Sequence, residues 1–268
     1  MPFFQTGNIK TYYELRGQGP AVVFIHGTAA SHDMWSPQMD YFSKTYAVLA
    51  YDIRGHQQSG GSDDKYTCAL FAEDLHSLLQ GLDIGEPVIC GVSLGGMIAE
   101  EYAVKYQTEI HGLVLVDTAA LSELTLSDEN LRASWRSSKR MLEELVKRKR
   151  PWSYTDLFTQ DFTIAPETRT YLKREQMKMD RLELLKLIDC IYSFRLPALR
   201  KIRVPTLVMV GENERKVVLD HAEVVLKMIP GSRKVVISGA GHVSNLENPE
   251  VFNRELDDFL RGLVISSI

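Results

Sequence analysis

The sequence predicts an α/β fold with a mostly parallel, doubly wound sheet and an inserted helical cap. Short apolar runs recur along the 268 residues and alternate with helical patterns, which is typical of a parallel sheet with helices on both faces. The alternation stops between about residues 121 and 200, where Leu, Met, Lys, Arg and Glu are abundant and no strand pattern occurs. This segment indicates several helices inserted into an otherwise regular α/β chain.

The predicted elements follow one another in the order expected of such a sheet. Residues 3–15 alternate around Gly7 and Asn8 and indicate an antiparallel hairpin at the sheet edge. The apolar runs predict buried strands at residues 21–25, 47–51, 88–90, 113–116, 206–210 and 234–237. Helical spacing predicts helices between several of them, for example at residues 69–82, 97–106 and 249–260.

The helical insertion divides the chain into two parts. We expect residues 1–120 and 201–268 to form the α/β core and residues 121–200 to form the cap. In open α/β sheets, ligands bind outside the carboxyl ends of the strands. A helical insertion that follows a strand is therefore expected to cover the binding site.

Composition argues against several classes of protein. The chain carries 31 Lys and Arg against 35 Asp and Glu, and this net charge of −4 gives no electrostatic case for nucleic acid or an anionic membrane. No run approaches the roughly 18 apolar residues that span a bilayer, and the first residues do not resemble a signal peptide. Cys68, Cys90 and Cys190 match neither a disulfide framework nor a metal motif. We expect a cytoplasmic protein without a metal or a cofactor.

Ser93 is the candidate nucleophile. It lies between a predicted buried strand and a predicted helix, and Gly91, Gly95 and Gly96 surround it. A serine on a sharp strand-to-helix turn has a strained backbone, and its neighbours must be small to avoid a collision. This position exposes the hydroxyl group at the carboxyl edge of the sheet.

His242 is the candidate general base. A serine hydroxyl is a weak nucleophile at neutral pH and needs a base that is itself held by a third group. His242 follows the last predicted strand on a loop with two glycines, which brings its imidazole to the same sheet edge as Ser93. An ordinary imidazole pKa of about 6.5 allows proton transfer in both directions.

Two carboxylates are candidates for the third group, and two backbone N–H groups for an oxyanion hole. Glu214, the leading candidate, follows the penultimate predicted strand. Asp117, the alternative, follows the strand at residues 113–116, and either carboxylate could orient the imidazole. The oxyanion donors are expected to be the N–H of Leu94, directly after the serine, and the N–H of Thr28, in the loop after the first core strand.

Four stretches of the chain together resemble one family. In order, they are residues 24–27, 51–56, 91–96 and 239–242, the last with residues 247–249. They resemble the serine-nucleophile branch of the α/β-hydrolase fold family, from about residue 19 to residue 260 outside the cap. The chain order of serine, acid and histidine is also that family's order. The resemblance implies the fold and a hydrolytic activity.

Two positions differ from the family pattern. The family usually has Asp where this chain has Glu214, although some members use Glu. The family's Arg-Gly-His stretch commonly continues with glycine, whereas here Gln57 and Gln58 follow His56. This difference changes a loop near the mouth of the expected site.

The nucleophile narrows the choice within the family. Haloalkane dehalogenases and epoxide hydrolases use Asp at this turn, so Ser93 argues against both. Residues 93–99 most resemble carboxylesterases and enol-lactone hydrolases. The leading hypothesis is a serine hydrolase that cleaves a small to medium carboxylic ester or lactone through an acyl-enzyme.

Alternatives remain open at this point. A carbon–carbon bond hydrolase would need cap cations such as Arg174 or Arg195 to hold a substrate carboxylate, and a cofactor-free haloperoxidase or perhydrolase would share most of the motifs. A non-hydrolytic ligand-binding protein on the same scaffold is a third class, and a homodimer is one alternative for the assembly. The insertion also holds aromatic candidates for a pocket wall: Trp135, Trp152, Tyr154, Phe158, Phe162, Tyr171, Tyr192 and Phe194.

Overall fold

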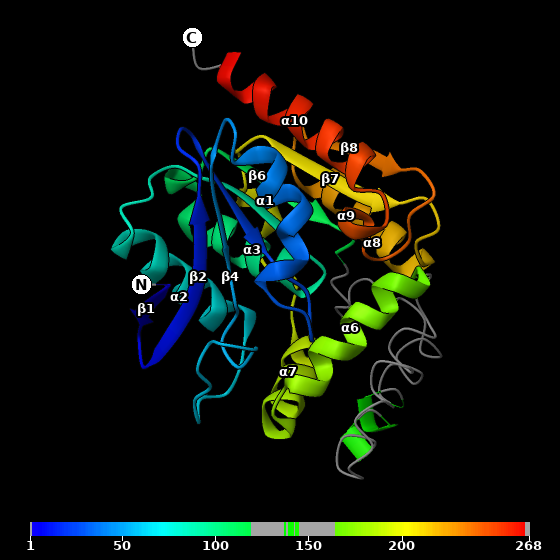
Figure 1. Cartoon of the computed structure of the whole chain (residues 1–268). Helices are drawn as coiled ribbons and strands as arrows, with labels where there is room; N and C mark the ends of the chain where they lie inside the picture. Colours follow the sequence, from blue (N-terminus) through cyan, green and yellow to red (C-terminus); the bar gives the residue numbers. More distant parts are fainter. Residues whose placement is uncertain (1, 119–136, 138, 142, 145–163, 266–268) are drawn as a thin grey trace.

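The structure is a computed structural model that describes residues 2–118, 137, 139–141, 143–144 and 164–265. Its centre is an eight-stranded sheet (Figure 1). The strands lie in the order β1 (Phe3–Thr6), β2 (Ile9–Arg16), β4 (Ala47–Tyr51), β3 (Ala21–Ile25), β5 (Val88–Val92), β6 (Gly112–Val116), β7 (Thr206–Gly211) and β8 (Arg233–Ile237). From β4 to β8 neighbouring strands are parallel, and the β1–β2 hairpin joins β4 antiparallel at one edge. The predicted fold class is confirmed.

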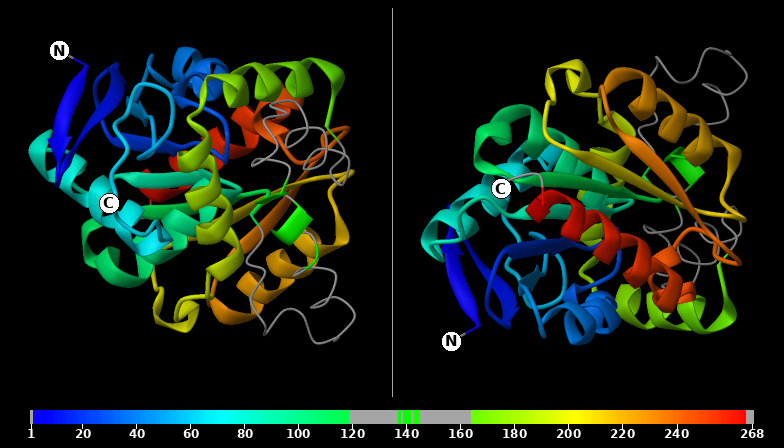
Figure 2. Two further views of the ribbon diagram at one scale, coloured as in Figure 1. Left: turned by 90° about the horizontal axis from the view of Figure 1, so that it is seen from below. Right: turned by 90° about the horizontal axis from the view of Figure 1, so that it is seen from above.

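Helices cover both faces of this sheet (Figure 2). One buried cluster includes residues from α1 (Ser36–Phe42) and α10 (Pro249–Ile265), and the other includes residues from α2 (Cys68–Gly81), α3 (Leu94–Tyr106) and α8 (Lys216–Met228). Successive residues of β3 alternate between the clusters, since Phe24 belongs to the first and Ile25 to the second. Because both faces are buried from β4 to β7, these strands are apolar at nearly every position. The prediction of a buried strand at residues 234–237 is wrong in its burial: β8 lies at the sheet edge, and Lys234 and Val236 are exposed.

The described part of the insertion contains two long helices, α6 (Pro166–Lys178) and α7 (Arg181–Ser193). Figure 1 shows both helices below the sheet, beyond the ends of the strands. Short helices complete the described elements: η1 (His32–Trp35), η2 (Gln107–Glu109), η3 (Leu199–Lys201) and α9 (Ser244–Glu247). Within the described part of the chain, every helix lacks the length or the apolar character that crossing a membrane requires.

The predicted strand and helix bounds agree closely with the observed ones. β3 and β4 have the predicted ends, and the other four core strands are one or two residues longer than predicted. The helix predicted at residues 97–106 begins earlier, at Leu94, because the turn at Ser93 leads directly into it. α10 also continues to Ile265, beyond the predicted end at residue 260.

Candidate active site

Ser93 lies on a strained turn between β5 and α3. Its backbone has φ of 53° and ψ of −115°, a combination that residues with a side chain rarely adopt. Two glycines allow this turn, since a Cβ at Gly91 would overlap the carbonyl of Gly95 and a Cβ at Gly95 would overlap the carbonyl of Ile25. The N–H of Ser93 donates to the carbonyl of Val116 at 2.9 Å, which anchors the turn to the neighbouring strand.

His242 meets Ser93 from the loop between β8 and α9. The Oγ of Ser93 lies 3.2 Å from Nε2 of His242, within hydrogen-bond distance, and the imidazole is buried. The loop approaches the sheet closely because Gly211, at the end of β7, has no side chain: a Cβ there would overlap the carbonyl of Gly241. Ser93 and His242 are therefore 149 positions apart in the chain and adjacent in space, as predicted for a nucleophile and its base.

Glu214 is the carboxylate that hydrogen-bonds the imidazole. Nδ1 of His242 lies 2.7 Å from Oε2 of Glu214, while Oε1 of Glu214 accepts from the N–H of Arg215 at 2.7 Å. This bond assigns the proton of the neutral imidazole to Nδ1 and leaves Nε2 as the acceptor that faces Ser93. The arrangement can draw the hydroxyl proton of Ser93 toward the imidazole.

Asp117 lies in the same corner of the protein with different partners. Its backbone has φ of 43° at the end of β6, and its side chain is fully buried. Oδ1 accepts from the N–H of Gly211 at 2.8 Å, and Oδ2 accepts from the N–H of Ser244 at 3.0 Å. Asp117 therefore joins the end of β7 to the chain just after His242.

The two carboxylates shift the pKa of the histidine. Burial lowers the pKa of His242, but the charge and the hydrogen bond of Glu214, with a smaller contribution from the charge of Asp117, outweigh it, so the pKa of His242 is raised. Burial and the nearby charge of Glu214 raise the pKa of Asp117 to about 7. The site thus concentrates negative charge around one imidazole, which stabilises its protonated form.

The residues that carry the two expected oxyanion donors lie near Ser93. Leu94 is the first residue of α3, directly after Ser93. Thr28 follows Gly27, and a Cβ built on Gly27 would lie 3.4 Å from Cβ of Ser93, so this loop passes close to the hydroxyl. The Oγ1 of Thr28 is buried without a hydrogen-bond partner.

Two histidines for which no role was predicted hold the loop of Thr28 in place. Nε2 of His26 accepts from the N–H of Ile53 at 3.0 Å, and Nε2 of His56 accepts from the N–H of Ala29 at 3.3 Å. Burial lowers the pKa of His26 and lowers that of His56 to about 3, so both rings remain neutral acceptors. The sequence feature that could have indicated this role is that each histidine lies within a stretch that resembles the family pattern.

A pocket opens above Ser93. Its volume, including the open mouth, is about 300 Å³, and it is mostly apolar. It is lined by Gly27, Thr28, Ala30, Met34, Val92, Ser93, Leu172, His242 and Val243. Leu172 comes from α6, so the described part of the insertion contributes to the wall. The described residues contain no group of three or more His, Cys, Asp or Glu side chains that could hold a metal ion.

None of the described aromatic candidates of the insertion is among the residues that line the pocket. The other candidates lie outside the described residues. The hydroxyl of Tyr171 donates to Oδ1 of Asp33 at 2.6 Å, Tyr192 packs against Leu184 and Ile188, and Phe194 belongs to one of the two core clusters. Trp135, Trp152, Tyr154, Phe158 and Phe162 lie outside the described residues.

The two cationic candidates differ in their surroundings. Arg174 donates from Nε to Glu175 at 2.7 Å and lies 3.7 Å from a carboxylate oxygen of Asp33, so two carboxylates already balance its charge. Arg195 is exposed, and it is not among the residues that line the pocket.

Comparison with known proteins agrees with this architecture. A model of the alpha/beta hydrolase fold family matches residues 20–249. The chain is 23% identical over 263 residues to 3-oxoadipate enol-lactonase 2 of Acinetobacter baylyi, covering 95% of this chain and 94% of that protein.

Two solved structures are similar over nearly the whole length. A thermophilic esterase from Thermogutta terrifontis, with malate bound, has a TM-score of 0.85 and 25% identity, covering 98% of this chain and 97% of that one. A bromoperoxidase from Bacillus anthracis has a TM-score of 0.83 and 26% identity, covering 94% and 96%.

Proposed function

Because this chain belongs to the alpha/beta hydrolase fold family, we propose that it is a serine hydrolase that cleaves a small to medium carboxylic ester or lactone. The observation that carries the proposal is the continuous series of contacts from Ser93 through His242 to Glu214, at 3.2 Å and 2.7 Å. The enol-lactonase and esterase relatives support ester or lactone hydrolysis as the general reaction.

In the proposed acylation step, Ser93 is the nucleophile and His242 the base. The hydroxyl proton of Ser93 moves to Nε2 of His242 while Oγ bonds to the carbonyl carbon of the substrate. The carbon–oxygen bond to the leaving alkoxide then breaks, and His242 gives its proton to that oxygen. In a lactone, the leaving oxygen stays attached to the acyl chain. Glu214 stabilises the imidazolium between these two transfers.

Deacylation repeats the same proton transfers with water. A water molecule gives a proton to His242 and bonds to the acyl carbon, after which the bond to Oγ breaks and Ser93 regains the proton from His242. In both steps we propose that the N–H groups of Thr28 and Leu94 hold the negative charge on the former carbonyl oxygen. Such a donor typically contributes about 3 kcal/mol to transition-state stabilisation.

The mostly apolar pocket supports a neutral substrate. A carbon–carbon bond hydrolase of the kind considered above needs a free cation near the site, and Arg174 is already balanced by Glu175 and Asp33. The bromoperoxidase relative keeps a haloperoxidase or perhydrolase reaction as the second candidate, since peroxide in place of water at the acyl-enzyme would yield a peroxyacid.

We propose that residues 1–120 and 201–268 form the core and that residues 121–200 form a cap, of which α6 and α7 are the described helices. We also propose a cytoplasmic location, with a homodimer as one alternative for the assembly.

A hydrolysis panel tests the proposed function. Wild type and Ser93→Ala are compared on p-nitrophenyl esters of short and medium acyl chains and on simple lactones, with perhydrolysis of the same esters measured alongside. We expect wild type to turn over at least one class far faster than the variant. Equal, background rates for the two proteins on all substrates would reject the proposal, provided that both unfold at similar temperatures.

A further inference from the structure

Gln57 holds a strained backbone conformation and makes a long-range contact. Its φ of 40° lies in the left-handed region, which glycine adopts easily and residues with a Cβ do not. Its Nε2 donates a hydrogen bond of 2.8 Å to the main-chain carbonyl of Glu175, 118 residues away in α6. The bond therefore joins the loop after β4 to a helix of the insertion.

The carbonyl that Gln57 reaches lies in the last turn of α6. The last four carbonyls of an α-helix lack the N–H partners that the interior ones have. The N–H of Met179, four residues beyond Glu175, donates to the carbonyl of Gln176 instead, at 3.1 Å. The side chain of Gln57 thus supplies a donor at the end of the helix and caps it from another part of the chain.

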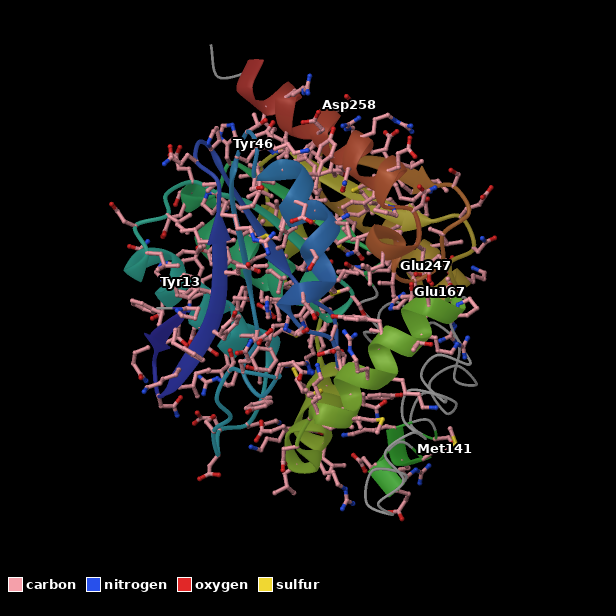
Figure 3. The ribbon with its side chains drawn as sticks, in the orientation of Figure 1. Tyr13, Tyr46, Met141, Glu167, Glu247 and Asp258 are labelled. Carbon is pink, nitrogen blue, oxygen red and sulfur yellow. The ribbon has the colours of Figure 1, made fainter. Side chains whose placement is uncertain are left out.

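The opposite end of α6 is also attached to the core. Oε1 of Glu247 accepts from the N–H of Ala165, directly before the helix, at 2.8 Å, and Oε2 accepts from the N–H of Gly241 at 2.6 Å. Figure 3 shows Glu247 close to Glu167 at the start of the helix. This first attachment therefore leads to the residue next to His242, and Gln57 provides a second one at the other end.

The pocket wall lies between these two attachments. Leu172 is 8% exposed and lines the pocket together with Ser93 and His242. It precedes Glu175 by three positions, so both residues lie on the same side of α6. The Oγ of Ser31, in the loop after β3, lies 3.4 Å from Oε2 of Glu175, which places this side against the core. A shift at the end of the helix would therefore move Leu172, a side chain that lines the pocket.

We propose that Gln57 is a specificity-determining residue: by holding the end of α6 it sets the space between Leu172 and Ser93 that a substrate acyl group occupies. This inference rests on the proposed ester or lactone hydrolysis for the nature of the occupant. Gln57 acts through α6 and is a positioning residue. The family pattern commonly has glycine at this position, and the proposal explains what the glutamine does there.

The test uses an isosteric change. Gln57→Glu keeps the shape of the side chain, removes the N–H donor and places a carboxylate beside the carbonyl of Glu175. We expect the ratio of kcat/KM for a p-nitrophenyl octanoate to that for the acetate to rise about 3- to 10-fold, the factor that corresponds to one lost hydrogen bond. The change is expected in KM, with kcat on the acetate unchanged. Amide hydrogen exchange at residues 173–179 is expected to accelerate by a similar factor.

Three further variants make the test decisive. Gln57→Asn keeps a donor and tolerates a left-handed backbone, so it should recover part of the wild-type ratio. Gln57→Gly removes the donor and the strain together, and it carries the test if Gln57→Glu does not fold. Gln58→Glu adds the same charge at the next, exposed position and should leave both readouts unchanged.

The outcomes separate this inference from the proposed function. Wild-type selectivity or wild-type exchange in both Gln57→Glu and Gln57→Gly would overturn the inference while ester hydrolysis stands. If wild type hydrolyses neither esters nor lactones, the proposed function fails, and the exchange at residues 173–179 alone then decides whether Gln57 holds α6.

Discussion

Oε2 of Glu214 lies 2.7 Å from Nδ1 of His242, and the charge and hydrogen bond of this carboxylate help to raise the pKa of a buried imidazole, which burial alone would lower. The same corner holds the buried carboxylate of Asp117, which binds the backbone N–H groups of Gly211 and Ser244. The two acids thus have separable tasks: Glu214 acts on the charge of the imidazole, and Asp117 acts on the position of two chain segments.

Substitution of each acid separates these tasks. Glu214→Gln should lower kcat by about 10³- to 10⁴-fold, because an amide neither holds the Nδ1 tautomer reliably nor stabilises the imidazolium. Asp117→Asn should lower kcat less and instead reduce the free energy of unfolding by about 1–3 kcal/mol, because a buried N–H loses its acceptor. Steady-state kinetics and urea unfolding of both variants measure the difference. A larger kcat loss in Asp117→Asn would reverse the assignment.

The acid limb of the pH profile should depend on Glu214. The base must be neutral to accept a proton, so kcat/KM falls as the pH drops through the pKa of His242. Because Glu214 raises this pKa, the limb of the wild type is expected above the ordinary histidine value of about 6.5. In Glu214→Gln, the acid limb of the residual activity should move to lower pH. Burial still lowers the pKa of His242 in this variant, while less negative charge remains to raise it.

A nearby acid provides the control for this shift. Glu212 lies two positions before Glu214, is exposed and accepts from the N–H of Gly239 at 2.8 Å. Glu212→Gln removes the same charge from the same loop and should leave the limb in place. An equal shift in both variants would mean that the general field of the loop, and not the contact with His242, sets the pKa.

The strain at Ser93 should be measurable as stability. A backbone with φ of 53° and ψ of −115° is expected to cost about 1–3 kcal/mol of folding free energy for a residue with a Cβ. Glycine avoids this strain, but part of the gain is offset because glycine loses more conformational entropy on folding. Ser93→Gly should therefore unfold with a free energy about 1 kcal/mol higher than Ser93→Ala, although both are inactive. Urea titrations at one temperature compare the two variants.

Ser43 is the matched position for this comparison, because its φ of −61° suits any residue. At this position Ser43→Gly should be less stable than Ser43→Ala, by about 0.5–1 kcal/mol in the free energy of unfolding. If glycine is also the less stable choice at Ser93, the turn is not strained and the structural basis for an exposed nucleophile is weakened.

Local patterns in the sequence were sufficient for most of the sheet and for the order of the site residues. Buried parallel strands are apolar at nearly every position. The ends of apolar runs such as residues 21–25 and 47–51 therefore predict the ends of the strands. Ser93 and His242 were predicted because each follows a strand, and parallel strands end at a common edge. The sequence favoured Glu214 and left Asp117 as the alternative acid, since both follow strands and only three-dimensional geometry distinguishes their hydrogen-bond partners.

The contacts that local patterns could not predict join segments far apart in the chain. Gln57 reaches Glu175 across 118 positions, and His56 reaches Ala29 across 27. Neither contact produces a periodic pattern in the sequence, because each depends on how two distant segments meet once the sheet has formed. Gln57 was recognisable only as a departure from a family pattern, and the pattern did not say what the side chain binds.

Covalent labelling of Ser93 tests the central claim most directly. A fluorophosphonate reacts with an activated serine and leaves a stable adduct, which peptide mass spectrometry assigns to one residue. We predict one adduct per chain on the peptide that contains Ser93 in the wild type, no adduct in Ser93→Ala, and much slower labelling in His242→Ala. A folded wild type that remains unlabelled, or that carries the adduct on another residue, would contradict the account.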